Sequence, residues 1–337
     1  PGTRWLDDPS GAEPVMNSSI LVAGHLKGTA VPVPFAGIIA PLTLTVVLAM
    51  PVGTVAAADD SLLTRAAEAY RSETLFYQPQ NRDASLSRQQ WQTLWRRTRE
   101  NGVHTLIVQW TQYGEETFGG ADGWLANALV DAERQGLELI IGLYQDPEYY
   151  ETLPDNARFR HYWYQQLAKA HARQQQIQRQ WPLTPVGWYL PEELDDWLFR
   201  EPGVRQELTR QLASASQQLT GPLHLSMFSG GFVTPGVYAA WAENITESGW
   251  QVWWQDDEGA RNLDPPMRQA YRDALSCRIG VVREAFARTS ATESDFQASP
   301  ATPRQRGNDC HPDAVFSLRY MPWAEALHQG PPGALAQ

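Results

Sequence analysis

The 337-residue chain is poor in cysteine and in basic side chains, and it has no glycine-rich phosphate loop. It carries 27 Lys and Arg against 38 Asp and Glu, a formal net charge of −11. Nucleic-acid phosphates require clustered Lys and Arg, so this balance argues against a nucleic-acid partner. The seven histidines are scattered without metal-ligand spacing, so no metal site and no cofactor are predicted.

The only two cysteines are Cys277 and Cys310. In an exported protein such a pair more often forms a disulfide than two free thiols. We therefore predict a bridge that closes a long loop and ties a late helix to the segment before the last strand. Two free thiols are the alternative.

One long hydrophobic run stands near the start of the chain, over residues 35–50. A Pro/Gly break and Ala56-Ala57-Ala58 follow it, a pattern typical of a cleaved secretory signal, with Met16 as a plausible start. The run is shorter than the about 20 apolar residues that span a bilayer. We predict a periplasmic or secreted protein, cleaved near Ala58, with no stable membrane span afterwards; an uncleaved anchor is the alternative.

The remaining chain alternates strand patterns with amphipathic helix patterns, as expected for a parallel sheet covered by helices. A doubly wound sheet would carry a glycine-rich loop after an early strand, so a (β/α)8 TIM barrel over residues 59–328 is predicted, followed by a disordered tail at 329–337. The seventh unit is expected to be irregular around residues 288–312. Strands are expected at residues 73–78, 103–110, 137–143, 186–190, 223–228, 251–254 and 315–320, with 294–298 as a short seventh candidate, and helices at 88–101, 123–135, 157–180, 204–219, 235–246 and 267–287.

The most informative stretch is residues 187–197, in which a strand pattern leads into four carboxylates. Pro191 cannot donate to a sheet ladder, so the strand is expected to end there. In a TIM barrel the carboxyl ends of the strands form the active-site edge. The alternative is that these acids form the first turn of the next helix, where the macrodipole favours them. The four are Glu192, Glu193, Asp195 and Asp196, framed by Trp188 and Trp197.

The other predicted strand ends carry carboxylates, amides and aromatic side chains, with no cysteine and no nucleophile elbow. This mixture suits a carbohydrate, because hydroxyls pair with amides and carboxylates while pyranose faces stack on aromatic rings. For about half of the aromatics, ordinary core packing is the expected role. Trp188 and Tyr189 alternate in direction, so at most one of them lines the barrel. The predicted substrate-binding residues are Glu192, Asp146, Gln109, Trp110, Tyr113, Tyr144, Gln255, Trp254, Tyr320 and Trp323.

Residues 188–196, Trp-Tyr-Leu-Pro-Glu-Glu-Leu-Asp-Asp, together with Gln-Asp-Asp-Glu-Gly at 255–259, resemble a bacterial family of exported, glycosidase-like TIM barrels of unassigned function. The resemblance covers roughly residues 73–325. Members of that family are similar to the clan of retaining glycosidases with an acid/base Glu after strand four, and some are encoded beside exopolysaccharide secretion systems. The resemblance implies that Glu193 is the acid/base residue and that Asp256 is a catalytic or substrate-binding carboxylate, with Asp257 as the alternative second carboxylate.

In that clan the nucleophile lies on strand seven, where the pattern of this chain is weakest. Glu293 and Asp295 are the carboxylates nearest to that region, so the nucleophile is not assigned. The leading interpretation is a periplasmic glycoside hydrolase or lyase-like enzyme that acts on a bacterial exopolysaccharide through paired carboxylates. One alternative is a non-catalytic polysaccharide-binding barrel of an exopolysaccharide secretion system. Another is a structural partner of that secretion machinery with a merely solvated acidic edge.

Overall fold

A computed structural model describes residues 68–152, 156–291, 296–306 and 310–328. The predicted signal peptide and tail lie outside these ranges, so the predicted domain boundaries remain predictions. Within the described residues, no helix combines the length and the apolar character needed to cross a membrane.

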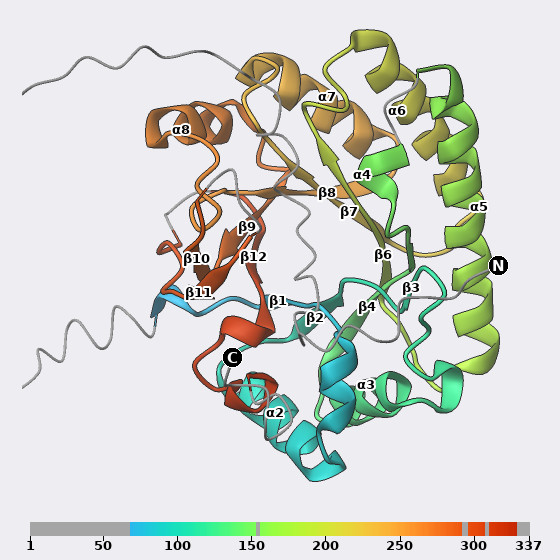
Figure 1. Cartoon of the computed structure of the whole chain (residues 1–337), viewed down its shortest axis with the longest axis vertical. Helices are drawn as coiled ribbons and strands as arrows, with labels where there is room; N and C mark the ends of the chain where they lie inside the picture. Colours follow the sequence, from blue (N-terminus) through green and yellow to red (C-terminus); the bar gives the residue numbers. More distant parts are fainter. Residues whose placement is uncertain (1–67, 153–155, 292–295, 307–309, 329–337) are drawn as a thin grey trace, which may run out of the picture.

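Eight parallel strands close into a barrel, in the order β1-β12-β9-β8-β7-β6-β4-β2 (Figure 1). The first strand pairs with both the second and the last, which completes the ring. The predicted TIM barrel is confirmed. The wall consists of β1 (Thr74–Tyr77), β2 (Thr105–Val108), β4 (Glu138–Gly142), β6 (Gly187–Asp195), β7 (Leu223–Phe228), β8 (Trp250–Gln255), β9 (Gly280–Glu284) and β12 (Asp313–Phe316).

Helices surround the barrel, with the long α5 along one side (Figure 1). Ser87 begins α2 as predicted, since its side chain accepts from the Gln90 backbone N–H in a capping box. A short parallel pair, β3 (Gln112–Tyr113) and β5 (Tyr144–Gln145), extends the strand ends. The main helices are α2 (Arg88–Glu100), α3 (Trp124–Arg134), α5 (Asn156–Gln180), α6 (Pro202–Ser216), α7 (Pro235–Glu247) and α8 (Pro265–Ala274), with α4 (Tyr149–Thr152) as a single turn.

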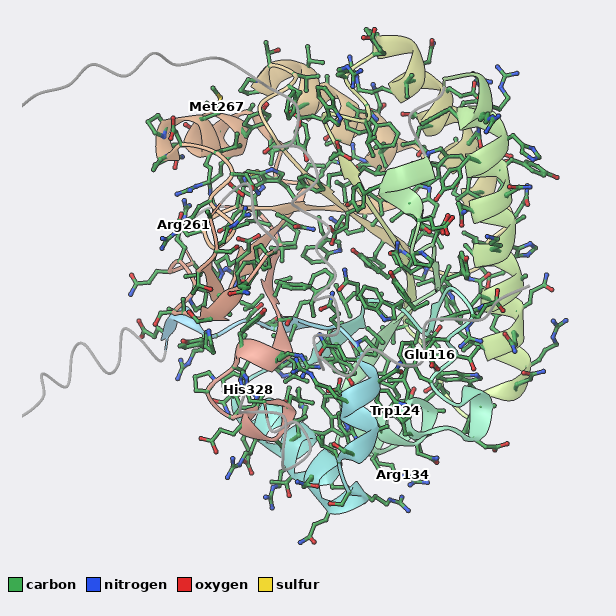
Figure 2. The ribbon with its side chains drawn as sticks, viewed as in Figure 1. Glu116, Trp124, Arg134, Arg261, Met267 and His328 are labelled. Atoms are coloured by element: carbon green, nitrogen blue, oxygen red, sulfur yellow. A yellow bond between two sulfur atoms is a disulfide. The ribbon has the colours of Figure 1, made fainter. Side chains whose placement is uncertain are left out.

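The core has two layers, and side chains fill both the barrel and the space under its helices (Figure 2). Tyr189 lies in the inner layer and Trp188 in the outer layer, so only one of the two lines the barrel. The alternation follows from the period of two along a strand. The inner layer contains Phe76, Ile107, Ile140, Tyr189, Trp253, Val282 and Ala314.

The seventh unit differs from its prediction. The helix predicted over 267–287 is confirmed only for its first part: α8 ends at Ala274, and Gly280–Glu284 forms the seventh barrel strand, β9. Gly280 packs against the Trp253 ring so closely that an added Cβ would lie 2.3 Å from it, which explains a glycine in this strand. The irregularity predicted near 288–312 belongs to a hairpin outside the wall, formed by β10 (Phe286–Arg288) and β11 (Ala298–Pro300).

Strand β6 also differs from its prediction, because it continues through Pro191 to Asp195. The register against β7 shifts between Leu190 and Leu194, so Pro191 lies in a bulge, where its missing N–H breaks no ladder bond. Helix α6 begins only at Pro202. The alternative in which the four acids form the first turn of that helix is therefore wrong.

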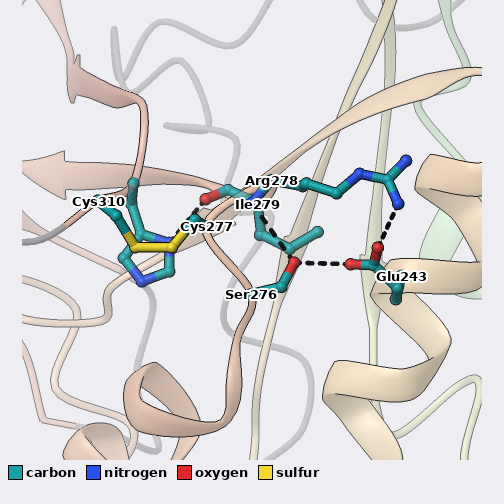
Figure 3. The surroundings of a disulfide bond; sticks show 7 residues. Glu243, Ser276, Cys277, Arg278, Ile279 and Cys310 are labelled. Atoms are coloured by element: carbon teal, nitrogen blue, oxygen red, sulfur yellow. Dashed lines mark hydrogen bonds and ion pairs between the residues drawn. A yellow bond between two sulfur atoms is a disulfide. The ribbon is translucent and has the colours of Figure 1, made fainter.

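The predicted disulfide between Cys277 and Cys310 is confirmed (Figure 3). It joins the connection between α8 and β9, rather than a helix itself, to the segment before β12. The same connection is tied to α7, because the Ser276 hydroxyl donates to Glu243 at 2.7 Å and Arg278 forms an ion pair with that carboxylate. These contacts fix the start of β9.

We predict that replacing both cysteines by serine lowers the free energy of unfolding by about 3–4 kcal/mol, the loop-closure entropy for a separation of 33 residues. The measurement is chemical denaturation of the oxidised wild-type protein and of the double variant. Reductant should lower the stability of the wild-type protein to that of the variant and leave the variant unchanged. Equal stabilities of the oxidised wild type and the variant would contradict the prediction.

Candidate active site

Gln109, Glu193 and Glu284 stand at the carboxyl ends of three barrel strands. Ile107 and Val282 lie in the inner layer, so Gln109 and Glu284, two residues further along, face the barrel axis. The Gln109 amide donates to Glu193 Oε1 at 3.2 Å. Strands β6 and β9 are separated by β7 and β8 in the ring of eight, which puts Glu193 and Glu284 on nearly opposite sides of the mouth.

Glu284 is held by the loop that follows β8. Its Oε2 accepts the backbone N–H groups of Gly259 and Ala260, both at 2.7 Å. An added Cβ at Gly259 would lie 3.0 Å from Glu284 Oε2 and 2.2 Å from the Phe286 carbonyl oxygen, so only glycine allows this approach. The chain therefore positions the Glu284 carboxyl with backbone donors.

Asp256 and Glu284 form an electrostatically coupled pair. Burial and the neighbouring charge of Asp256 raise the pKa of Glu284 well above its usual value, against the two backbone donors. Burial raises the pKa of Asp256 to about 6. Burial and the neighbouring charge of Asp256 therefore both oppose ionisation of Glu284.

Glu284 is not among the predicted site residues, because the predicted helix runs through β9. The available signal was the short apolar run at 279–282, which ends in a charged pair as β6 ends in its acids. Glu293 and Asp295, the carboxylates named near the expected seventh strand, lie outside the described residues. Glu284 is the carboxylate that the structure places at the end of strand seven.

Asp257, predicted as a possible catalytic carboxylate, uses both oxygens to shape its own loop. Oδ1 accepts from the backbone and side-chain nitrogens of Asn262 at 3.0 and 2.9 Å, and Oδ2 accepts from the Leu263 N–H at 2.7 Å. Asp257 also has a positive φ of 54°. Its role in the structure is to hold the loop that carries Asp256 and Gly259.

Asp195 and Asp196 likewise organise turns beside the mouth. Asp195 Oδ1 accepts the N–H groups of Trp197 and Leu198, each at 2.8 Å. Asp196 is fully buried and accepts backbone N–H groups from the loop after β7. Of the four adjacent acids, these two are thus engaged with backbone amides.

Glu192 lies with Asp146 in a second polar cluster, against α5. Burial raises the pKa of Glu192 to about 8, and the charge of Asp146 adds to the shift. Among the described residues, no side chain hydrogen-bonds to the Glu192 carboxyl. Asp146 Oδ2 accepts from Tyr162 at 2.7 Å and from Gln166 at 2.9 Å. The predicted pair Glu192 and Asp146 is therefore brought together.

The predicted aromatic residues divide into two groups. Tyr320 packs on Phe286, with ring centroids 5.3 Å apart, and its pKa is raised by burial and, to a smaller extent, by Glu284. Trp254 instead lies in the outer core layer and Trp323 donates to Thr98 of α2, so neither serves as a stacking surface at the mouth in this arrangement. Trp110 is likewise buried in the outer core layer, where it packs on Tyr113 with ring centroids 5.6 Å apart. Strand ends also carry Tyr144, whose ring lies under Lys169, and Gln255, which is on the same face of β8 as the inner-layer Trp253.

Residues 73–305 match the family model described as a domain of unknown function, DUF4434. The chain belongs to the DUF4434 family. The uncharacterized protein YbcH of Escherichia coli strain K12 is 31% identical over 270 residues, which cover 75% of this chain and 91% of that protein. The predicted membership in a family of unassigned function is thus confirmed.

This DUF4434 domain is also similar in fold to a solved structure from Bacteroides thetaiotaomicron, titled as that of a "putative alpha-L-fucosidase". The TM-score is 0.52 at 12% sequence identity, with 77% of this chain and 92% of that chain covered. At this identity the likeness concerns the fold. It agrees with the closed barrel described above.

Two further features of the DUF4434 domain concern metal ligands and surface hollows. In the described residues, no three His, Cys, Asp or Glu side chains gather to hold a metal ion. A hollow of about 700 Å³ lies on the outer face between α5 and α6, lined by residues that include Tyr164 and Gln211. The carboxylates described above belong to the strand ends and not to this hollow.

Proposed function

We propose that this protein is a glycoside hydrolase that cleaves a poly- or oligosaccharide between Glu193 and the Asp256–Glu284 pair. The observation that supports this most is the placement of Glu193 on β6 and Glu284 on β9, nearly opposite each other at the active-site edge, with Asp256 directly after β8. Glycosidic bond cleavage needs one protonated and one ionised carboxyl that flank the bond. In this proposal Glu193 supplies the protonated carboxyl, and the Asp256–Glu284 pair on the other side of the bond supplies the ionised one.

In this proposal Gln109 orients Glu193 through the 3.2 Å hydrogen bond, and Glu193 donates a proton to the glycosidic oxygen as the bond from that oxygen to the anomeric carbon breaks. A water molecule then adds to the anomeric carbon and returns a proton to Glu193, which completes the hydrolysis. The negative charge of the Asp256–Glu284 pair faces the positive charge that develops on the sugar ring in the oxocarbenium-like transition state. The backbone donors of Gly259 and Ala260 hold Glu284 in place before the substrate binds. This preorganisation lowers the cost of reaching the transition state.

For the substrate class, we propose a bacterial exopolysaccharide acted on outside the cytoplasm. Amides and aromatic rings at the strand ends, such as Gln255, Tyr113 and Tyr320, match the hydroxyls and apolar faces of sugars. The disulfide is compatible with an oxidising compartment. The link to an exopolysaccharide system comes from the family resemblance of residues 188–196 and 255–259.

The test is Glu193→Gln, assayed on bacterial polysaccharides by reducing-end release and on two series of aryl glycosides. We expect turnover of polysaccharides and 4-nitrophenyl glycosides to fall about 10²–10⁴-fold, because the leaving oxygen loses its proton donor. Hydrolysis of 2,4-dinitrophenyl glycosides should fall much less, since that leaving group needs no proton. Glu148→Gln, an exposed glutamate after β5, is the matched control and should leave all rates unchanged.

Two outcomes would contradict the hydrolase proposal. If the wild-type protein binds polysaccharide without releasing product, and Glu193→Gln binds equally well, the protein is a non-catalytic polysaccharide-binding barrel. If neither protein binds or cleaves any of the glycans, the acidic edge has a structural role in a secretion complex. Equal loss on both aryl series would remove Glu193 from the proton-donor role.

A further inference from the structure

Trp197 and Phe232 form an exposed aromatic pair on the loops that follow β6 and β7. Their side chains are 37% and 39% exposed, and their ring centroids lie 4.8 Å apart at an interplanar angle of 61°. The Arg200 guanidinium lies 4.2 Å from the centroid of the Trp197 ring. Two large aromatic rings exposed side by side on a folded domain mark a binding surface more often than isolated exposed residues do.

A buried carboxylate holds this pair in place. Asp196 directly precedes Trp197 and is fully buried, and it accepts the N–H groups of Gly230, Phe232 and Val233 at 2.6, 2.9 and 3.2 Å. Charge-assisted hydrogen bonds of this kind are the strong ones in proteins. One carboxylate therefore ties the loop after β6 to the loop after β7.

Helix α8 and two glycines complete the support. The Tyr271 hydroxyl lies 3.2 Å from Asp196 Oδ2 and also contacts the Val233 carbonyl oxygen. An added Cβ at Gly230 would lie 2.8 Å from the Phe232 ring and 3.2 Å from Asp196, and Gly231 has a φ of +85°. The loop thus needs both glycines to bring the Phe232 ring back toward Asp196 and Trp197.

We propose that Trp197 and Phe232 form a sugar-stacking subsite at the rim of the mouth, beyond the carboxylate centre. The proposal rests on the proposed function for its ligand class, a pyranose unit of an extended glycan chain. Trp197 lies four residues after Glu193, past the end of the same strand, and Phe232 follows the neighbouring strand β7, so the pair stands on the same edge of the barrel as the carboxylates. Aromatic side chains lose little conformational entropy on binding, and their flat rings stack on the apolar faces of pyranose units. Arg200 offers N–H donors to the hydroxyls of these units.

The experiment uses the full chain in the Glu193→Gln background, so that ligands are not consumed. Isothermal titration calorimetry measures the affinity for cellohexaose, chitohexaose and hexamannuronate, and for the corresponding disaccharides. Trp197→Ala and Phe232→Ala should each weaken hexasaccharide binding about tenfold, while disaccharide affinities stay unchanged. Tyr164→Ala is the matched control, since Tyr164 is 71% exposed on α5, outside the mouth, and should change no affinity.

The proposal is overturned if both rim variants bind hexasaccharides as tightly as the parent, if Tyr164→Ala weakens binding equally, or if the parent binds none of the three hexasaccharides. It is also overturned if Trp197→Ala abolishes self-association of the parent in sedimentation, which would make the rim a protein interface. Circular dichroism melts confirm that each variant is folded. Failure of the hydrolase proposal is distinguishable, because the wild-type protein would then release no product while hexasaccharide affinity still depended on Trp197 and Phe232.

Discussion

Glu284→Gln reduces polysaccharide turnover by about 10⁴-fold or more in our expectation, with little change in melting temperature. The activity falls because the Asp256–Glu284 pair loses a carboxyl that faces the reacting sugar. The fold persists because burial already favours the neutral form of Glu284, and the amide oxygen of Gln can accept the same N–H groups of Gly259 and Ala260. The measurements are single-turnover rates on a glycan that the wild type cleaves, and thermal melts.

The pairing itself is tested by a double-variant cycle. Asp256→Asn alone should also lose activity, but Asp256→Asn with Glu284→Gln should cost far less than the sum of the two losses, because the carboxyls act as one unit. Glu148→Gln again serves as the exposed control. Full activity in Glu284→Gln would show that the carboxyl at the end of β9 is not catalytic. Asp256 would then be the partner of Glu193.

Stability is expected to fall as the pH rises from 6.5 to 8.5, by a few kcal/mol in the free energy of unfolding. Burial raises the pKa of Glu192 to about 8 and that of Asp195 to about 7, whereas unfolded carboxyls titrate near about 4. The folded state therefore retains protons that the unfolded state has lost. This contribution to stability is complete below the unfolded pKa and is lost as the pH rises through the folded pKa.

The range above pH 6.5 is chosen because the buried His224 affects the pH dependence of stability mainly at lower pH. Burial lowers the pKa of His224 to about 4. His224 has the opposite sign, since it destabilises the fold as the pH falls below the unfolded histidine value near about 6.5. Glu192→Gln should raise the melting temperature at pH 8.5 by several degrees and flatten the pH dependence, while Glu148→Gln should not. A melting temperature that is constant or rises across this window would refute the buried, proton-bound state of Glu192.

Several elements were predictable because local pattern and tertiary environment agree. The run at 223–228 is apolar and bounded by Gly221 and Gly230, and it forms β7 over the same residues. Ser87 caps α2 through local hydrogen bonds: its side chain accepts from the Gln90 backbone N–H, and the Gln90 side chain accepts from the Ser87 backbone N–H. These bonds do not depend on the rest of the fold. The disulfide was predictable because the chain carries an export signal pattern and its two cysteines allow a single pairing.

Strand β9 was not predictable in the same way. The four-residue apolar run at 279–282 is ambiguous between a strand and the end of a buried helix, and the helical pattern of α8 leads directly toward it. What makes Gly280–Glu284 a strand is long-range: it pairs with β8 and β12, and Gly280 leaves room for the Trp253 ring. Glu284 could be recognised as a candidate site residue only once residues 280–284 were known to form a barrel strand.

The sequence by itself determined the barrel, the disulfide and the edge where the acids gather, because strand and helix periodicities and strand ends are local properties of the chain. Only the tertiary structure distinguished the acids from one another. Glu193 accepts a hydrogen bond from the Gln109 amide after β2, and the charge of Asp256 raises the pKa of Glu284. Asp196 and Asp257 accept hydrogen bonds from backbone N–H groups of loops. The physical reason is that burial, neighbouring charge and hydrogen-bond partners decide what a carboxyl does, and in this protein these come from segments far apart in the chain.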